Sequence, residues 1–121
     1  MCTIRSLKLA KIINKPWGNE EIWASCEVYL GKIITIDANH RLSRQYHCQK
    51  EETIRVLSGV LHLEIGEKDN IQIILLAPGE TYHIVPGTIH RFCAKSEEVK
   101  LLEVSTYYPD DVVRLEDDYN R

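Results

Sequence analysis

The pattern that most restricts the fold of this chain is a series of short apolar stretches, most of them separated from the next by turn-forming residues. The stretches occupy residues 20–25, 29–36, 52–59, 60–66, 71–76, 81–87, 90–95 and 99–105. Several of them alternate apolar and polar residues, which is typical of half-buried strands. Gly, Pro, Asn and Asp lie between the stretches, where hairpins need them. The sequence therefore predicts an all-β barrel or sandwich.

The length and composition predict one globular domain. A chain of 121 residues is long enough for a single core and too short for two. We expect that core at about residues 15–108, with peripheral N-terminal and C-terminal segments. Helix is expected for a turn or two at most, near Ser6 to Ile13 or in the acidic tail after Pro109. Hydrophobic residues at 44% and charged residues at 27% exclude a disordered or fibrous chain.

Charge and cysteine usage restrict the partners and the compartment. The formal net charge of -3 provides no basic field, so neither nucleic acid nor an anionic membrane is expected as a partner, and a small polar substrate is favoured. The four cysteines form no C-x-x-C pair, which predicts free thiols in a reducing cytosol. No apolar run approaches the roughly 18 residues that span a bilayer. We therefore expect a soluble cytoplasmic protein.

Strand alternation assigns four polar residues to the inner face of the predicted barrel. Gln45 and His47 share one face of their strand, because side chains two residues apart in a strand point the same way. Glu52 begins a face that continues with apolar residues of the core. In the stretch "HRFCA", His90 shares its face with a phenylalanine. Each of the four side chains is therefore expected to point inward.

A divalent cation would satisfy all four polar side chains at once. An unsatisfied buried polar group costs roughly 1–3 kcal/mol, and a bare carboxylate costs more. Gln45 and Glu52 offer oxygen atoms, and His47 and His90 offer nitrogen atoms. This mixed set suits Zn as the first candidate, with Mn, Ni, Co and Fe as alternatives. The sequence predicts one such ion, with open positions for substrate oxygens.

These residues resemble the two motifs of the cupin superfamily, G-x5-H-x-H-x3,4-E-x6-G and G-x5-P-x-G-x2-H-x3-N. The residues that follow the first spacing are Asn39, Gln45, His47, Glu52 and Gly59. The residues that follow the second are Gly79, Gly87 and His90. The resemblance implies that residues 1–121 form a single cupin-type barrel, a jelly roll or double-stranded β-helix. It also implies that Gln45, His47, Glu52 and His90 hold the metal inside that barrel.

Within the cupins, the chain resembles the cupin domain of type II phosphomannose isomerases over roughly Lys15 to Arg121. The resemblance rests on "RLSRQYH", "RVLSG", "GTIHRF", "LLEVS" and the ending "DDVVRLEDDYNR". Two features depart from it: "HCQ" stands where those enzymes have three consecutive histidines, and the usual nucleotidylyltransferase domain is absent. The resemblance therefore implies isomerisation of a sugar phosphate, with mannose 6-phosphate as the first candidate. From the second departure we expect no guanylyltransferase activity.

An aldose-ketose isomerase also needs a base that moves a proton between two carbons, and groups that hold a phosphate. Glu103 shares its strand face with Leu101 and is the predicted base, with Tyr82 as the next candidate. The cations near the motifs are the candidate phosphate ligands. They are Arg41, Lys50, Arg114 and Arg44, of which Arg44 is on the outward phase of its strand.

Two other functional classes fit the same residues. His47, His90 and Glu52 also form the two-histidine, one-carboxylate set of non-haem iron oxygenases, although Gln45 as a fourth ligand would leave less room for oxygen and substrate. A non-catalytic sugar-binding accessory cupin is the third reading, because one barrel hosts many functions. The remaining histidines, His40, His62 and His83, are expected to be structural or exposed. The edges of a small open barrel favour a homodimer.

Overall fold

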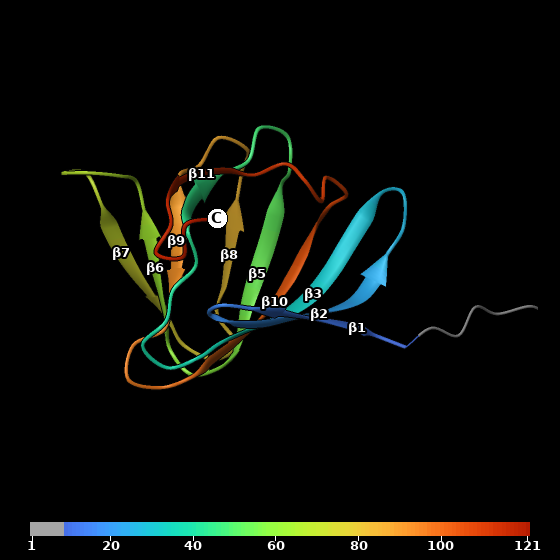
Figure 1. Cartoon of the computed structure of the whole chain (residues 1–121), viewed down its shortest axis with the longest axis horizontal. Coiled ribbons are helices and arrows are strands. Elements are labelled where there is room, and N and C mark those ends of the chain that lie inside the picture. Colours follow the sequence, from blue (N-terminus) through green and yellow to red (C-terminus); the bar gives the residue numbers. More distant parts are fainter. Residues whose placement is uncertain (1–8) are drawn as a thin grey trace, which may run out of the picture.

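The computed structural model describes residues 9–121, which form eleven β-strands and no helix (Figure 1). The strands are β1 (Lys11–Lys15), β2 (Gly18–Ser25), β3 (Tyr29–Ile36), β4 (Arg44–Tyr46), β5 (Glu52–Ser58), β6 (Leu61–Ile65), β7 (Gln72–Leu76), β8 (Thr81–Ile84), β9 (His90–Cys93), β10 (Val99–Thr106) and β11 (Val113–Glu116). The prediction of an all-β protein is confirmed. In this part of the chain there is also no helix long and apolar enough to cross a membrane.

The strands form two antiparallel sheets. One has six strands in the order β1-β2-β3-β10-β5-β8, and the other has five in the order β11-β4-β9-β6-β7. In Figure 1 the segment between β10 and β11 crosses the top of the molecule from the first sheet to the second. This crossing brings the C-terminal residues onto strand β4, far from the strand that precedes them in sequence.

The core lies between the sheets because alternate residues of the paired strands point inward. On β5, Ile54 and Val56 are buried, while Arg55 between them is exposed. On β10, Leu101 is buried opposite Val56. Further along the same inner faces the buried residues become polar, at Glu52 and Glu103. One end of the interior is therefore apolar, and the other is built from charged and polar side chains.

Two residues of the first predicted motif have backbone conformations that explain their identity. Gly59 follows β5 with φ of 76°, and a Cβ atom there would overlap the carbonyl oxygen of Glu98. Asn39 stands where the cupin motif has glycine, and its φ is 60°. Asparagine tolerates this left-handed conformation better than most residues do. The replacement of glycine by Asn39 therefore preserves the turn before β4.

The expected helical turns are wrong for the described residues. Lys11–Lys15 form strand β1, which pairs with β2, and Val113–Glu116 form β11, which pairs with β4. Residues 6–8 of the expected N-terminal turn lie outside the described part of the chain. In both places an available neighbouring strand supplies backbone hydrogen bonds, which a single isolated helical turn cannot match.

Candidate functional site

Two histidines and one glutamate converge at the polar end of the interior. His47 follows β4, Glu52 begins β5, and His90 begins β9. Their side-chain ligand atoms lie within 4.8 Å of one another, and the residues are 6%, 3% and 2% exposed, respectively. The two histidine rings are 5.4 Å apart between centroids. Residues from both sheets therefore meet in one buried cluster.

Main-chain carbonyl groups determine which nitrogen of each histidine faces the cluster. The Nδ1 atom of His47 lies 2.5 Å from the carbonyl oxygen of Asp111, and that of His90 lies 2.8 Å from the carbonyl oxygen of Thr88. Because a carbonyl oxygen can only accept a hydrogen bond, both Nδ1 atoms carry a proton. In the neutral rings, both Nε2 atoms then carry a lone pair. A metal ligand needs such a fixed tautomer.

The contact between His47 and Glu52 brings two acceptors together. Nε2 of His47 lies 3.1 Å from Oε2 of Glu52. Oε2 is buried and accepts no hydrogen bond from the described residues. Two lone pairs at this separation repel unless a proton or a cation lies against them. The donor set of two nitrogens and one carboxylate therefore fits a divalent cation.

The charges around the cluster keep Glu52 ionised and His90 neutral. Burial opposes the charge of Glu52, but the neighbouring His47 and the charge of Lys50 outweigh it and lower the pKa of the carboxyl. Burial also lowers the pKa of His90, although the charge of Glu52 opposes that effect. An ionised carboxylate beside a neutral imidazole is the protonation state in which both can bind a metal.

Gln45 lies in the same row as His90. The two residues face each other across β4 and β9, and both line the same cavity. The Nε2 amide of Gln45 donates a hydrogen bond of 2.9 Å to Oγ of Ser43. This bond directs the amide nitrogen toward Ser43, just before β4, and the carbonyl oxygen, Oε1, has no hydrogen-bond partner among the described residues.

Glu103 and Lys50 form a buried ion pair beside the cluster. Nζ of Lys50 lies 3.0 Å from Oε2 of Glu103 and 3.7 Å from Oε2 of Glu52. Burial lowers the pKa of Lys50, but the two carboxylates outweigh it and raise that pKa. Burial, together with the charge of Glu52, raises the pKa of Glu103. The lysine is therefore charged, and Glu103 holds a proton more readily than an exposed glutamate does.

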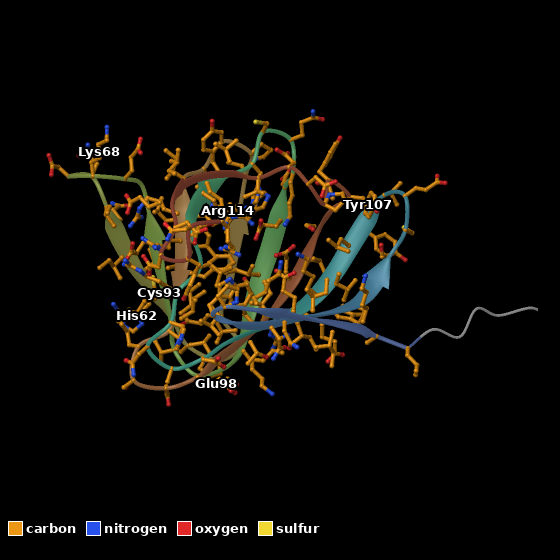
Figure 2. The ribbon with its side chains drawn as sticks, in the orientation of Figure 1. His62, Lys68, Cys93, Glu98, Tyr107 and Arg114 are labelled. Carbon is orange, nitrogen blue, oxygen red and sulfur yellow. The ribbon has the colours of Figure 1, made fainter. Side chains whose placement is uncertain are left out.

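All of these side chains line one cavity of about 310 Å³. Ligand pockets typically measure about 300–1,000 Å³. Tyr107 and Arg114 belong to its wall, and Figure 2 shows both in the upper half of the view, while His62 and Cys93 lie in the lower half. The histidine-carboxylate cluster is therefore part of a cavity that can hold a small polar molecule.

The remaining predicted residues lie in different places. Arg114 lines the cavity, as Lys50 does. Arg41 is paired with Asp118, and Arg44 is paired with Glu64 and Glu116, so neither reaches the cavity. Tyr82 packs against the apolar core opposite Ile54 and does not line the cavity.

Arg44 lies on the outward phase of its strand, where a side chain is expected to be exposed to solvent, but it is buried. Arg44 does point away from the cavity, but it is 3% exposed because the C-terminal segment covers it. Arg91 on the neighbouring strand β9 is 1% exposed and reaches Glu116 and Asp118. The outer face of the five-stranded sheet is therefore closed by ion pairs with the C-terminal segment.

Asp111 is a site residue that the sequence reasoning missed. Its carboxylate accepts hydrogen bonds from the backbone amides of Cys48, Gln49 and Lys50, which lowers its pKa to about 2. Its carbonyl oxygen accepts the Nδ1 proton of His47. These hydrogen bonds of Asp111 connect the loop between β4 and β5 to the C-terminal segment. Asp111 lies in the ending "DDVVRLEDDYNR" that carries part of the resemblance, but the 64 residues between it and His47 leave no local spacing that would connect the two.

The sequence matches a known family over most of its length. Residues 5–117 match the family described as Mannose-6-phosphate isomerase C-terminal. The mannose-1-phosphate guanylyltransferase RfbM of Salmonella typhimurium strain LT2 is 32% identical over 106 residues, 84% of this chain and 21% of the relative. The xanthan biosynthesis protein XanB of Xanthomonas campestris pv. campestris is 30% identical over 113 residues, 90% of this chain and 23% of the relative. The chain thus spans about a fifth of the length of these relatives.

Solved structures agree with the fold. Oxalate decarboxylase from Bacillus subtilis superposes with a TM-score of 0.78 at 15% identity, over 95% of this chain and 33% of that one. A sugar phosphate isomerase from a cupin superfamily of Silicibacter pomeroyi superposes with a TM-score of 0.66 at 15% identity, over 84% of this chain and 71% of that one. At this identity the likeness is one of fold alone, and it confirms the predicted cupin-type barrel.

Proposed function

Because the chain belongs to the Mannose-6-phosphate isomerase C-terminal family, we propose that it is a metal-dependent isomerase that interconverts the aldose and ketose forms of a sugar phosphate. Mannose 6-phosphate is the first substrate to test. The observation that carries the proposal is the pair of facing acceptors, His47 Nε2 and Glu52 Oε2, at 3.1 Å. A buried pair of this kind is unfavourable without a cation, and it lies in a cavity of suitable size.

The proposed metal ligands are Gln45, His47, Glu52 and His90. Zn is the first candidate, and Mn, Ni, Co and Fe suit the same donors. Once bound, such an ion would supply a Lewis acid for the carbonyl oxygen of the open-chain sugar. The hydrogen bonds of the two Nδ1 atoms to Asp111 and Thr88 keep both imidazoles oriented for this purpose.

Glu103 is the proposed base. It would remove a proton from the carbon next to the sugar carbonyl and return it to the carbonyl carbon, while the hydroxyl proton passes from its own oxygen to the former carbonyl oxygen, so that the proton count is unchanged at the end of the cycle. Its carboxylate lines the cavity and is deeply buried. The ammonium group of Lys50, 3.0 Å away, holds the carboxylate in place.

The first experiment measures metal content. The purified protein should hold about one divalent ion per chain, because His47, Glu52 and His90 form the one such cluster found among the described residues. His47→Ala and His90→Ala should each remove most of the ion, whereas His62→Ala should not. His62 is the matched control, since it lies on β6 and does not line the cavity. Full metal occupancy in both site variants would contradict the assignment.

The second experiment measures turnover. Protein loaded with one metal at a time should convert mannose 6-phosphate to the corresponding ketose phosphate, and in heavy water deuterium should enter at C1 or C2. Glu103→Gln should keep its metal and lower both rates by roughly 10²- to 10⁴-fold. Sugar binding without turnover for any metal would support an accessory role instead, and oxygen uptake with Fe(II) would support an oxygenase.

A further inference from the structure

Arg114 lies in a row of three residues across neighbouring strands. On β11 and β4, Arg114 faces Gln45, and on β4 and β9, Gln45 faces His90. Residues directly opposite each other in antiparallel strands point to the same side of a sheet. Arg114 therefore shares the inner face with the proposed metal ligands, and it lines the same cavity. Arg44, which precedes Gln45 on β4, points to the opposite side of the sheet.

Three of the four other cations that line the cavity have acidic partners: Lys32 pairs with Glu20, Lys50 with Glu103 and Glu52, and Arg121 with Asp117. The fourth, Lys15, makes no ion pair among the described residues, but its single ammonium group cannot form the two parallel hydrogen bonds of a guanidinium. Within residues 9–121, Arg114 makes no ion pair and donates no side-chain hydrogen bond. A guanidinium group free to form two parallel hydrogen bonds is suited to a phosphate.

The position of Arg114 also fits the length of a sugar phosphate. Opposite residues on adjacent strands have Cβ atoms about 5 Å apart, so the row places the Cβ of Arg114 about 10 Å from that of His90. An open-chain hexose has five C–C bonds of about 1.5 Å, which span roughly 6 Å when extended. With its reacting carbons at the metal cluster, the sugar would present a group on C6 to the Arg114 side chain.

We propose that Arg114 binds the phosphate group of the substrate and thereby selects phosphorylated over unphosphorylated sugars. The proposal takes from the proposed function that the ligand is a sugar phosphate, but it concerns binding of that ligand and not its turnover. The preference for phosphorylated sugars would then depend on one residue of the cavity wall, Arg114. The candidates Arg41 and Arg44 are excluded by their acidic partners on the outer face.

The test compares two ligands that differ only in phosphate. Isothermal titration of the metal-loaded protein should give tighter binding of mannose 6-phosphate than of mannose. Arg114→Gln should weaken binding of mannose 6-phosphate by about 10- to 100-fold, because two charge-assisted hydrogen bonds are lost. Its affinity for mannose should be unchanged. Arg114→Lys should lie between the two, since lysine keeps the charge and loses the two-pronged geometry.

Arg55→Gln is the matched control. Arg55 lies on the exposed face of β5, outside the cavity, so its removal changes net charge by the same amount without changing the site. Metal content should be equal in all variants. If Arg114→Gln keeps the preference of the wild type for the phosphorylated sugar, the proposal is wrong. A wild type that binds both sugars equally, or neither, overturns it as well. A selective loss in a protein that never isomerises would support Arg114 while the proposed activity fails.

Discussion

Lys50 is the one cation in direct contact with both buried carboxylates of the cavity, among the described residues. At an effective dielectric constant of about 20, charges 3.0 Å apart attract by about 5 kcal/mol. Removing one partner of a buried ion pair costs about 3–5 kcal/mol, because the other charge is left without compensation. We therefore expect Lys50→Met to lower the free energy of unfolding of the metal-free protein by about 3–5 kcal/mol. The melting temperature should fall by roughly 10–20 °C.

A double mutant separates the loss of the charge from the loss of the side chain. In Lys50→Met/Glu103→Gln the nearer of the two uncompensated carboxylates is gone, so at least half of the lost stability should return. The assay is urea unfolding in the presence of a chelator. If Lys50→Met alone does not fold, the double mutant compared with Glu103→Gln still shows what the loss of the lysine costs once that carboxylate is gone, and this cost should stay below about 3 kcal/mol.

Lys32→Met provides the matched control. Its Nζ lies 3.3 Å from Oε1 of Glu20, but the side chains are 15% and 13% exposed. Water reaches this pair more easily, so its loss should cost only about 1 kcal/mol. If Lys50→Met is no less stable than Lys32→Met, Lys50 does not compensate the two carboxylates. A double mutant no more stable than Lys50→Met would refute the reasoning equally.

Three further predictions follow from individual contacts. Gln45→His should keep the metal, because imidazole is at least as good a ligand as an amide oxygen. The variant should still lower turnover, because the larger ring changes where substrate oxygens can lie. Turnover equal to that of the wild type would mean that Gln45 has no specific role in the reaction. Asp111→Ala should weaken metal binding by roughly 10- to 100-fold in a chelator competition, whereas Asp110→Ala should not. Cys93 is buried, and burial together with the charge of Glu64 raises its pKa to about 11, so it should resist alkylation at pH 8 until the protein unfolds. The exposed Cys48 should react at once. Peptide mass mapping measures the labelling of each cysteine, and equal labelling of the two would contradict this prediction.

The inward residues could be predicted because strand alternation is a local property. Once a stretch is assigned as a strand, the backbone fixes which side chains share a face. Glu52 with Ile54, and Glu103 with Leu101, are buried for this reason. His90 could be placed with Phe92 by the same argument. Strand alternation therefore predicts which polar side chains enter the interior, without any knowledge of which strands pair.

The C-terminal segment could not be placed in this way. Its residues Glu116 and Asp118 pair with arginines more than twenty residues away, and in the case of Arg44 and Glu116 the separation is 72 residues. A local pattern does not tell which acid meets which arginine. The same segment explains why Arg44 and Arg91 are buried on a face that alternation assigns to solvent. Burial on an outer face depends on what covers it, which is a property of topology.

The tautomers of the two histidines show a deeper limit of sequence motifs. The groups that fix them are main-chain carbonyls, and a carbonyl is present at every residue. A motif can therefore record the two histidines without recording what orients them. For His90 the carbonyl is local, at Thr88 two residues away. For His47 the carbonyl belongs to Asp111. The position of Asp111 depends on the hydrogen bonds that its carboxylate accepts from three backbone amides.

A chain with the same His-x4-Glu spacing and an apolar residue in place of Asp111 would keep both histidines. It would lose the contact that turns the Nε2 atom of His47 toward Glu52. Asp111 is therefore the residue to inspect first when a related sequence has the ligands but binds no metal.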